Sequence, residues 1–89
     1  MIKVQEYLDQ NYPLNKRNYI IKLNISRTNL EGKLELKGFV NLEELDCSHN
    51  QITDLDLVEC KHLRKLNCSF NQLTTIDFLY SISFPSKLE

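Results

Sequence analysis

The sequence has little of what several kinds of active site require. Only two of its 89 residues are glycine, which leaves no glycine-rich loop for cradling phosphate and no glycine-flanked nucleophile turn. The three cysteines are odd in number and form no Cys-x-x-Cys pair, so neither a disulfide framework nor a zinc site is indicated. We therefore expect reduced thiols, no cofactor, no metal and no enzymatic activity.

Long apolar runs and an excess of charge of one sign are also missing. No stretch approaches the roughly 18 apolar residues of a membrane span, and charged residues lie where a signal peptide after Met1 would need its hydrophobic segment. The 11 basic and 12 acidic side chains give a net charge of −1, so no overall field attracts nucleic acid. We expect a cytoplasmic protein that binds neither membranes nor nucleic acid.

One sequence pattern occurs twice between Leu42 and Asp77. Residues 42–56 and 63–77 share LxxLxCSxNQ[IL]TxxD, and every counterpart lies 21 positions away. A dense match at a period of about 20 to 29 residues is typical of a repeat solenoid. A weaker copy begins at Ile20, with Thr28 at the position that asparagine holds in the later copies.

Each copy is predicted to open with a short strand, to turn at its asparagine and to return. Leu42, Leu45 and Cys47 point inward from the strand, and stacked copies pair their strands in parallel at about 4.8 Å, which merges the apolar positions into one core. Asn50 and Asn71 are predicted to hydrogen-bond the backbone of their own and the adjacent turn. They are structural candidates.

The segment before the repeats is predicted to be helical. Residues 1–10 space their apolar side chains as a helix does, and Pro13 should end that helix. We interpret it as an N-terminal cap on the first coil; a free-standing membrane or partner helix is the alternative. Residues 14–19 are predicted to be a connector with Lys16 and Arg17 exposed, and Gly32 is expected to supply a turn with positive φ.

The repeats resemble the leucine-rich repeat superfamily and are similar to the 21-residue repeats of bacterial and fungal repeat proteins. The resemblance implies an α/β repeat solenoid, a short arc of about three coils with parallel strands on the concave face and an N-terminal capping helix. We place the cap and connector at residues 1–18 and the repeats at 19–78 (about 20–41, 42–62 and 63–78). Residues 79–89 are an apolar tail or the start of an incomplete further repeat.

Members of this superfamily mostly act as protein-recognition surfaces or as the recognition part of larger signalling proteins. The resemblance therefore implies a non-enzymatic protein–protein interaction module that binds a protein partner through its concave face. The alternative is an N-terminal structural fragment of a longer leucine-rich repeat signalling or scaffold protein, with no independent activity. Edge-to-edge self-association through the C-terminal coil is a further expectation, because an uncovered strand exposes unpaired backbone groups.

Outward strand residues are predicted to form rows across the coils. Charges of the first row should neutralise one another by pairing Glu44 with its neighbours Lys22 and Lys65. The last row combines a charge, a titratable ring and an exposed aromatic, a mixture typical of interface anchors, although these rings could equally cover the edge of the turn. The candidate protein-binding residues are Arg27, Asp46, His49, Lys65 and Phe70. A nucleophilic pair of Cys47 with His49 is not expected, because the thiol is predicted to be buried.

Overall fold

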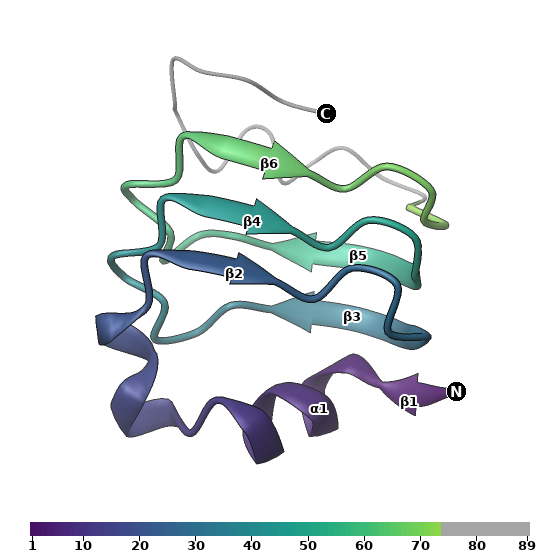
Figure 1. Cartoon of the computed structure of the whole chain (residues 1–89), viewed down its shortest axis with the longest axis horizontal. Coiled ribbons are helices and arrows are strands. Elements are labelled where there is room, and N and C mark those ends of the chain that lie inside the picture. Colours follow the sequence, from purple (N-terminus) through teal and green to yellow (C-terminus); the bar gives the residue numbers. More distant parts are fainter. Residues whose placement is uncertain (74–89) are drawn as a thin grey trace.

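Two short helices and six strands make up residues 1–73, the part of the chain that the computed structural model describes. Strand β1 (Ile2–Lys3), helix α1 (Val4–Asn11) and the 3-10 helix η1 (Leu14–Tyr19) come first. They are followed by β2 (Lys22–Asn24), β3 (Leu30–Glu35), β4 (Glu44–Asp46), β5 (Gln51–Asp56) and β6 (Lys65–Asn67) (Figure 1). The end of the third repeat and the tail, predicted on residues 74–89, lie outside the described residues.

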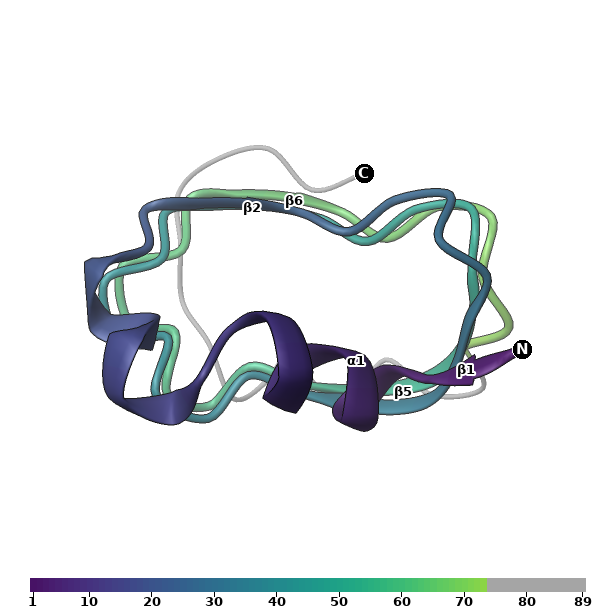
Figure 2. The same ribbon diagram turned by 60° about the horizontal axis from the view of Figure 1, so that its bottom comes forward.

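The strands form two parallel sheets, in the orders β2-β4-β6 and β1-β3-β5. Figure 2 shows the chain running round a flattened ring, with one sheet along each long side. Residues 20–41 and 42–62 each give one strand to each sheet, so the predicted parallel stacking of the repeats is confirmed. In the first sheet Lys22 lies beside Glu44 and Glu44 beside Lys65, as the 21- and 22-residue offsets predict.

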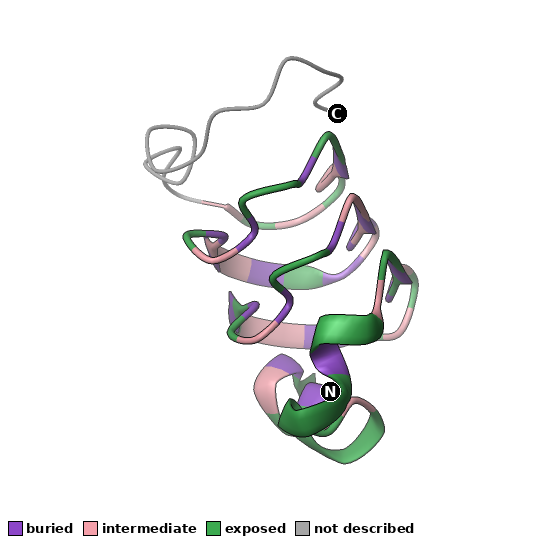
Figure 3. Ribbon diagram, turned by 90° about the vertical axis from the view of Figure 1, so that its left-hand side faces the viewer, coloured by how far each residue is buried: buried purple, intermediate pink, exposed green. Residues whose placement is uncertain are grey.

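The space between the sheets holds one apolar core. The inward positions predicted for the strands and return legs are buried, among them Leu23, Leu45, Leu66, Leu34 and Leu55. Figure 3 shows buried residues recurring along each turn of the chain, separated by exposed ones. Cys68 is only half-buried, unlike its counterpart Cys47, because β6 is the last strand of its sheet within residues 1–73.

The N-terminal helix lies against β3, and the prediction that it begins at Met1 is wrong. Ile2 and Lys3 instead form β1 and pair with Leu30 and Glu31 of β3, because the outer edge of β3 needs partners for its backbone groups. The Gln5 side-chain amide continues this pairing: its Oε1 accepts from the Glu35 N–H at 3.1 Å and its Nε2 donates to the Glu35 carbonyl at 3.3 Å. Val4 and Leu8 of α1 are buried in the core.

The connector is a 3-10 helix, and the prediction that Arg17 is exposed is wrong. Its side chain is 3% exposed and every guanidinium nitrogen donates a hydrogen bond. The acceptors are the Tyr12 carbonyl at 2.7 Å, the Lys37 carbonyl at 2.9 Å and Asp9 Oδ1 at 3.0 Å. The guanidinium carbon also lies 5.1 Å from the Phe39 ring centroid. These partners compensate the cost of burying the cation and join α1 and η1 to the first repeat.

The return leg of the first repeat passes through Gly32, where the pairing of β3 with β5 is irregular. This glycine has φ +97°, as predicted. The register of β3 with β5 shifts between Gly32 and Lys33: their partners are Ile52 and Asp54, so the additional residue at this point is Thr53 of β5 and not a residue of the first repeat. The following leucines, Leu34 and Leu55, are again direct partners.

Candidate protein-binding face

Asparagine side chains fix the backbone where each strand of the first sheet ends. Asn50 Nδ2 donates to the carbonyls of Ile25, Cys47 and Ser48, while its Oδ1 accepts from the N–H groups of Thr28 and Leu30. Asn71 repeats the arrangement one unit later and reaches back to the Cys47 carbonyl and the Ile52 N–H. The predicted backbone role of both asparagines is confirmed.

A second side chain in each repeat forms a local turn just before this point. The Oδ1 atom of Asn24, Asp46 or Asn67 accepts both the N–H and the hydroxyl of the serine two residues on, with O–O distances of 2.6 to 2.7 Å. In such Asx turns a short polar side chain accepts a backbone hydrogen bond from the residue two positions on, and so takes the place of a backbone acceptor. They bend the chain at the same place in all three units, so the residues that follow are presented alike.

The residues that follow are Arg27, His49 and Phe70, and all three have left-handed backbone conformations. Their φ values are 54°, 56° and 56°. This region is strained for most residues other than glycine, asparagine and aspartate, and for a bulky side chain it is a genuine outlier. The three side chains therefore leave the face at equivalent points and in one row.

The side chains of this row touch one another, as the sequence placed them. Arg27 Nη2 lies 3.2 Å from His49 Nε2, and because a guanidinium can only donate, a hydrogen bond between them has Nε2 as its acceptor. The His49 and Phe70 rings stack at a centroid distance of 4.3 Å and an interplanar angle of 13°. Phe70 is 73% exposed. A guanidinium and two aromatic rings thus form a continuous outward ridge.

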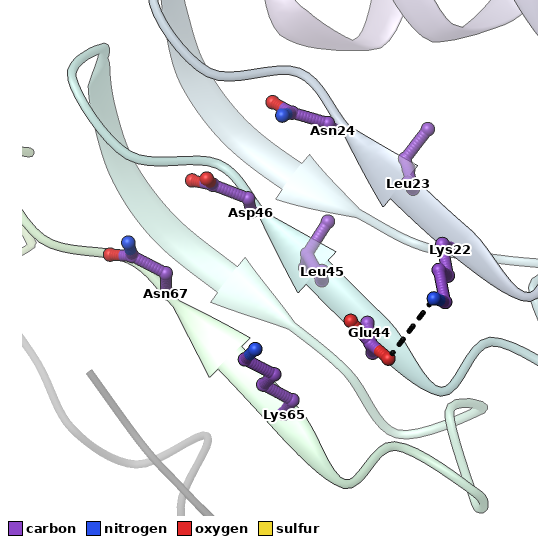
Figure 4. A pocket seen from close by; sticks show the side chains of 8 residues that line it. All are labelled: Lys22, Leu23, Asn24, Glu44, Leu45, Asp46, Lys65 and Asn67. Carbon is purple, nitrogen blue, oxygen red and sulfur yellow. Dashed lines mark ion pairs between the residues drawn. The ribbon is translucent and has the colours of Figure 1, made fainter.

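The charged row at the start of the strands pairs differently from the prediction. Lys22 Nζ lies 3.7 Å from Glu44 Oε2, as predicted, but the second cation on Glu44 is Arg64, with Nη2 at 3.4 Å, and the predicted Glu44–Lys65 pair is not formed (Figure 4). Arg64 precedes Lys65 on the same chain segment and also bonds Glu43 at 3.3 Å. Its longer, forked side chain can reach both carboxylates, whereas Lys65 has a single point charge.

An open hollow of about 420 Å³ lies over the middle of the sheet. Its polar lining comes from the first two rows, Lys22, Glu44 and Lys65 together with Asn24, Asp46 and Asn67 (Figure 4). Asp46 and Lys65 of the predicted set thus line the hollow, whereas Arg27, His49 and Phe70 form the ridge at the strand exits. Prediction from sequence missed Arg64 and Glu43; their opposite charges at equivalent positions, 21 residues apart, were the available signal.

The face offers no activated nucleophile within residues 1–73. The pKa of the Cys47 thiol is raised to about 12, mainly by burial and to a lesser extent by the neighbouring Cys68 and Asp46. The Ser48 hydroxyl donates to Asp46 rather than to a histidine, and His49 Nε2 is occupied by Arg27. Among these residues no group of three or more His, Cys, Asp or Glu side chains could hold a metal ion, and no helix there is long and apolar enough to cross a membrane.

Residues 40–81 match a family model described as leucine rich repeats in two copies. This match supports a leucine-rich repeat assignment, and the mixed helix and strand content with parallel strands fits that fold. Leucine-rich repeats generally mediate protein–protein interaction and are typically non-enzymatic. No curated protein and no solved structure matches the chain.

Proposed function

We propose that the chain is a non-enzymatic protein-interaction module that recognises a protein partner through the outward face of the β2-β4-β6 sheet. The observation that carries the proposal is Phe70. A phenylalanine that is 73% exposed in a left-handed conformation contributes nothing to the core and costs about 1 to 2 kcal/mol of backbone strain. Asparagine or glycine would fill this turn at lower cost, so the aromatic side chain is best explained by a contact it makes outside the chain.

The charged groups of this face that form no ion pair in the described part of the chain support the proposal that it is the recognition surface. Four of its charged groups form ion pairs with one another, Lys22 and Arg64 with Glu44 and Glu43. Arg27, Asp46 and Lys65 have no ion-pair partner among residues 1–73. Together with the stacked rings of His49 and Phe70 they are the groups on this face that are free to bind a partner.

The same proposal includes the organisation of the chain. Residues 1–18 act as a cap and connector, residues 19–78 form a short solenoid arc of about three coils with the recognition face on its concave side, and residues 79–89 are a tail or the start of a further repeat. The buried Val4 and Leu8 of α1 support the cap. Free thiols at Cys47 and Cys60 agree with a reducing, cytoplasmic location.

The test is a double variant, His49→Ala with Phe70→Ala, compared with Tyr19→Ala. Tyr19 is the matched control, because it is an aromatic residue that is 78% exposed but lies in η1. Both proteins should unfold in urea within about 0.5 kcal/mol of the wild type. Proteins captured from a lysate of the source cell and identified by mass spectrometry should be lost with the double variant and kept with the control. If the double variant keeps every captured protein, this face is not the recognition surface.

The second candidate is a structural part of a longer leucine-rich repeat signalling or scaffold protein with no activity of its own. This candidate also predicts that the double variant is as stable as the wild type, but it does not predict a loss of binding. The asparagine ladder, by which we mean the hydrogen bonds of Asn50 and Asn71 to the backbone, favours this second candidate. Each asparagine bonds backward to the preceding unit, so the same pattern can be extended to further units. Under this candidate the wild type and the double variant capture the same set of proteins.

A further inference from the structure

A row of three side chains crosses the β2-β4-β6 sheet at the last residue of each strand. Asn24 pairs with Asp46, and Asp46 with Asn67, as direct strand partners. Neighbouring members of the row are therefore about 4.8 Å apart, and the outer two about 9.6 Å. All three line the hollow over the sheet, and Figure 4 shows their side chains pointing the same way. The strand register thus fixes the spacing of this row.

The Asx turns determine which atom of each side chain is left to bind a partner. In all three residues Oδ1 accepts the N–H and the hydroxyl of the serine two positions on. Because a backbone N–H needs an oxygen acceptor, the second polar atom is Nδ2 in Asn24 and Asn67 and Oδ2 in Asp46. Within residues 1–73 no hydrogen bond or ion pair uses these three atoms. The row therefore presents a donor, an acceptor and a donor to the hollow.

An extended partner segment that ran along the middle strand would meet a different set of groups. Its side chains on one face are about 6.6 Å apart, so two basic residues would lie over Glu44 and Asp46. Glu44 already has two cations at its Oε2, with Lys22 Nζ at 3.7 Å and Arg64 Nη2 at 3.4 Å. The unused donors and acceptor of the row are thus arranged across the strands and not along one of them.

Resting on the function proposed above, we propose that the partner presents an α-helix that lies across the three strands and carries Glu-x-x-x-Lys-x-x-Glu on one face. Residues i, i+4 and i+7 share a helix face and are about 6.0 and 10.5 Å along the axis from the first, against about 4.8 and 9.6 Å in the row. On one face of an extended chain the same steps are about 6.6 and 13.2 Å, which exceed the row. The lysine meets Asp46, and the glutamates meet Asn24 and Asn67. Lys65, on the same face of β6 two residues before Asn67, attracts the glutamate at that end.

The row itself supplies conservative variants for a test. Asparagine and aspartate occupy equivalent positions in it and form the same Asx turn. Asp46→Asn replaces the acceptor by a donor and should keep the turn. The double variant, Asp46→Asn with Asn67→Asp, keeps the composition and the net charge and moves the carboxylate one strand along. Both variants should unfold at the same urea concentration as the wild type, so a change in binding reports the row and not the fold.

The experiment measures binding of fluorescein-labelled peptides to the full chain by fluorescence anisotropy. The peptides are alanine-rich and about 18 residues long, enough to form a helix in water. One carries Glu-x-x-x-Lys-x-x-Glu, and its isomer carries Glu-x-x-x-Glu-x-x-Lys. The first should bind the wild type on the order of tenfold more tightly than Asp46→Asn, because that variant lacks the charged acceptor for the lysine. The isomer should prefer the double variant to the wild type by a similar factor, since its lysine then meets the moved carboxylate.

A third peptide tests the helix. It is the first peptide with proline in place of the alanine before the lysine, and it should bind the wild type on the order of tenfold more weakly because proline breaks the helix. The inference is overturned if this peptide or the isomer binds the wild type as well as the first, if moving the carboxylate leaves the preference unchanged, or if no peptide binds. Loss of captured partners in the His49 and Phe70 double variant is scored separately, so the proposed function can stand when this pattern does not.

Discussion

Replacing Asn50 by alanine should remove most of the stability of the fold. The side chain is 8% exposed and its Oδ1 is the acceptor for the N–H groups of Thr28 and Leu30, at 3.1 and 3.0 Å. Alanine leaves both donors without that acceptor, and an unsatisfied buried donor costs about 1 to 3 kcal/mol. The three carbonyls that Asn50 bonds lose less, because each accepts a second hydrogen bond, from Thr28 Oγ1, Asn71 Nδ2 or the Arg27 N–H.

The two donors together give an expected cost of about 2 to 6 kcal/mol. A chain of 89 residues has a total stability of about 4 to 13 kcal/mol, so the variant should be marginal or unfolded at room temperature. Asn50→Asp separates the two halves of the interaction. It keeps the acceptor but turns a carboxylate oxygen toward three carbonyls, so it should also destabilise the protein.

Urea unfolding followed by far-UV circular dichroism measures the free energy, with Asn41→Ala as the control. Asn41 is exposed and donates one hydrogen bond, to the Asn18 carbonyl at 2.9 Å, so its loss should cost less than about 0.5 kcal/mol. Amide hydrogen exchange measures the effect at the two donors themselves: the backbone amides of Thr28 and Leu30 should lose protection from exchange in any Asn50 variant that remains folded. Equal stability of the Asn50 and Asn41 variants would refute the reasoning, as would unchanged protection of the two amides.

Three further predictions concern the core, a turn and the thiols. Leu45→Ala should cost about 2 to 5 kcal/mol in urea unfolding, because the side chain is 2% exposed; a cost below about 0.5 kcal/mol would contradict its inward position. Gly38→Ala should destabilise more than Gly32→Ala in the same assay: both have positive φ, but a Cβ at Gly38 would lie 2.9 Å from Leu14 Cδ1 and one at Gly32 meets open space. Burial raises the pKa of Cys47 and of Cys60 to about 12, so both thiols should react with iodoacetamide at neutral pH far more slowly in the folded than in the urea-unfolded chain. Because these pKa values lie above the ordinary 9.0, stability should be constant below pH 9 and should fall between pH 9 and 12; a stability that rises over this range would contradict the burial of the thiols.

Features that recur in the sequence could be predicted because the repeat fixes their neighbours. A residue and its counterpart 21 or 22 positions on lie side by side in a stack of equal units, so the contact of Arg27 with His49 and of His49 with Phe70 follows from the offset alone. The same offset placed Asn50 beside the backbone of the preceding unit, and a short amide can both donate and accept there.

Features that occur once could not be predicted in this way. Arg17 has no counterpart in the repeats, and its acceptors come from three separate segments, at Asp9, Tyr12 and Lys37. An arginine in a polar stretch is normally exposed, and nothing local in the sequence shows that three acceptors converge on it. The choice of Arg64 over Lys65 as the second cation on Glu44 is similar, since it depends on side-chain reach at the strand start and not on the strand register.

At the turn after each strand of the β2-β4-β6 sheet, the fold determines the backbone conformation but not the side chain. The hydrogen bonds that hold this turn come from neighbours of the left-handed residue. An Asx turn is formed by the residue three positions before it, and an asparagine such as Asn50 follows one position after it. These bonds set the backbone conformation whatever the side chain of the left-handed residue is. Arginine, histidine and phenylalanine occupy that position in turn, and none of them contributes to the core. A position whose backbone is fixed by its neighbours, and whose side chain points outward at some cost in strain, can change its chemistry with little effect on stability. In this chain the proposed recognition surface can therefore be altered at Arg27, His49 and Phe70 while the hydrogen bonds of Asn50 and Asn71 beside them keep the fold.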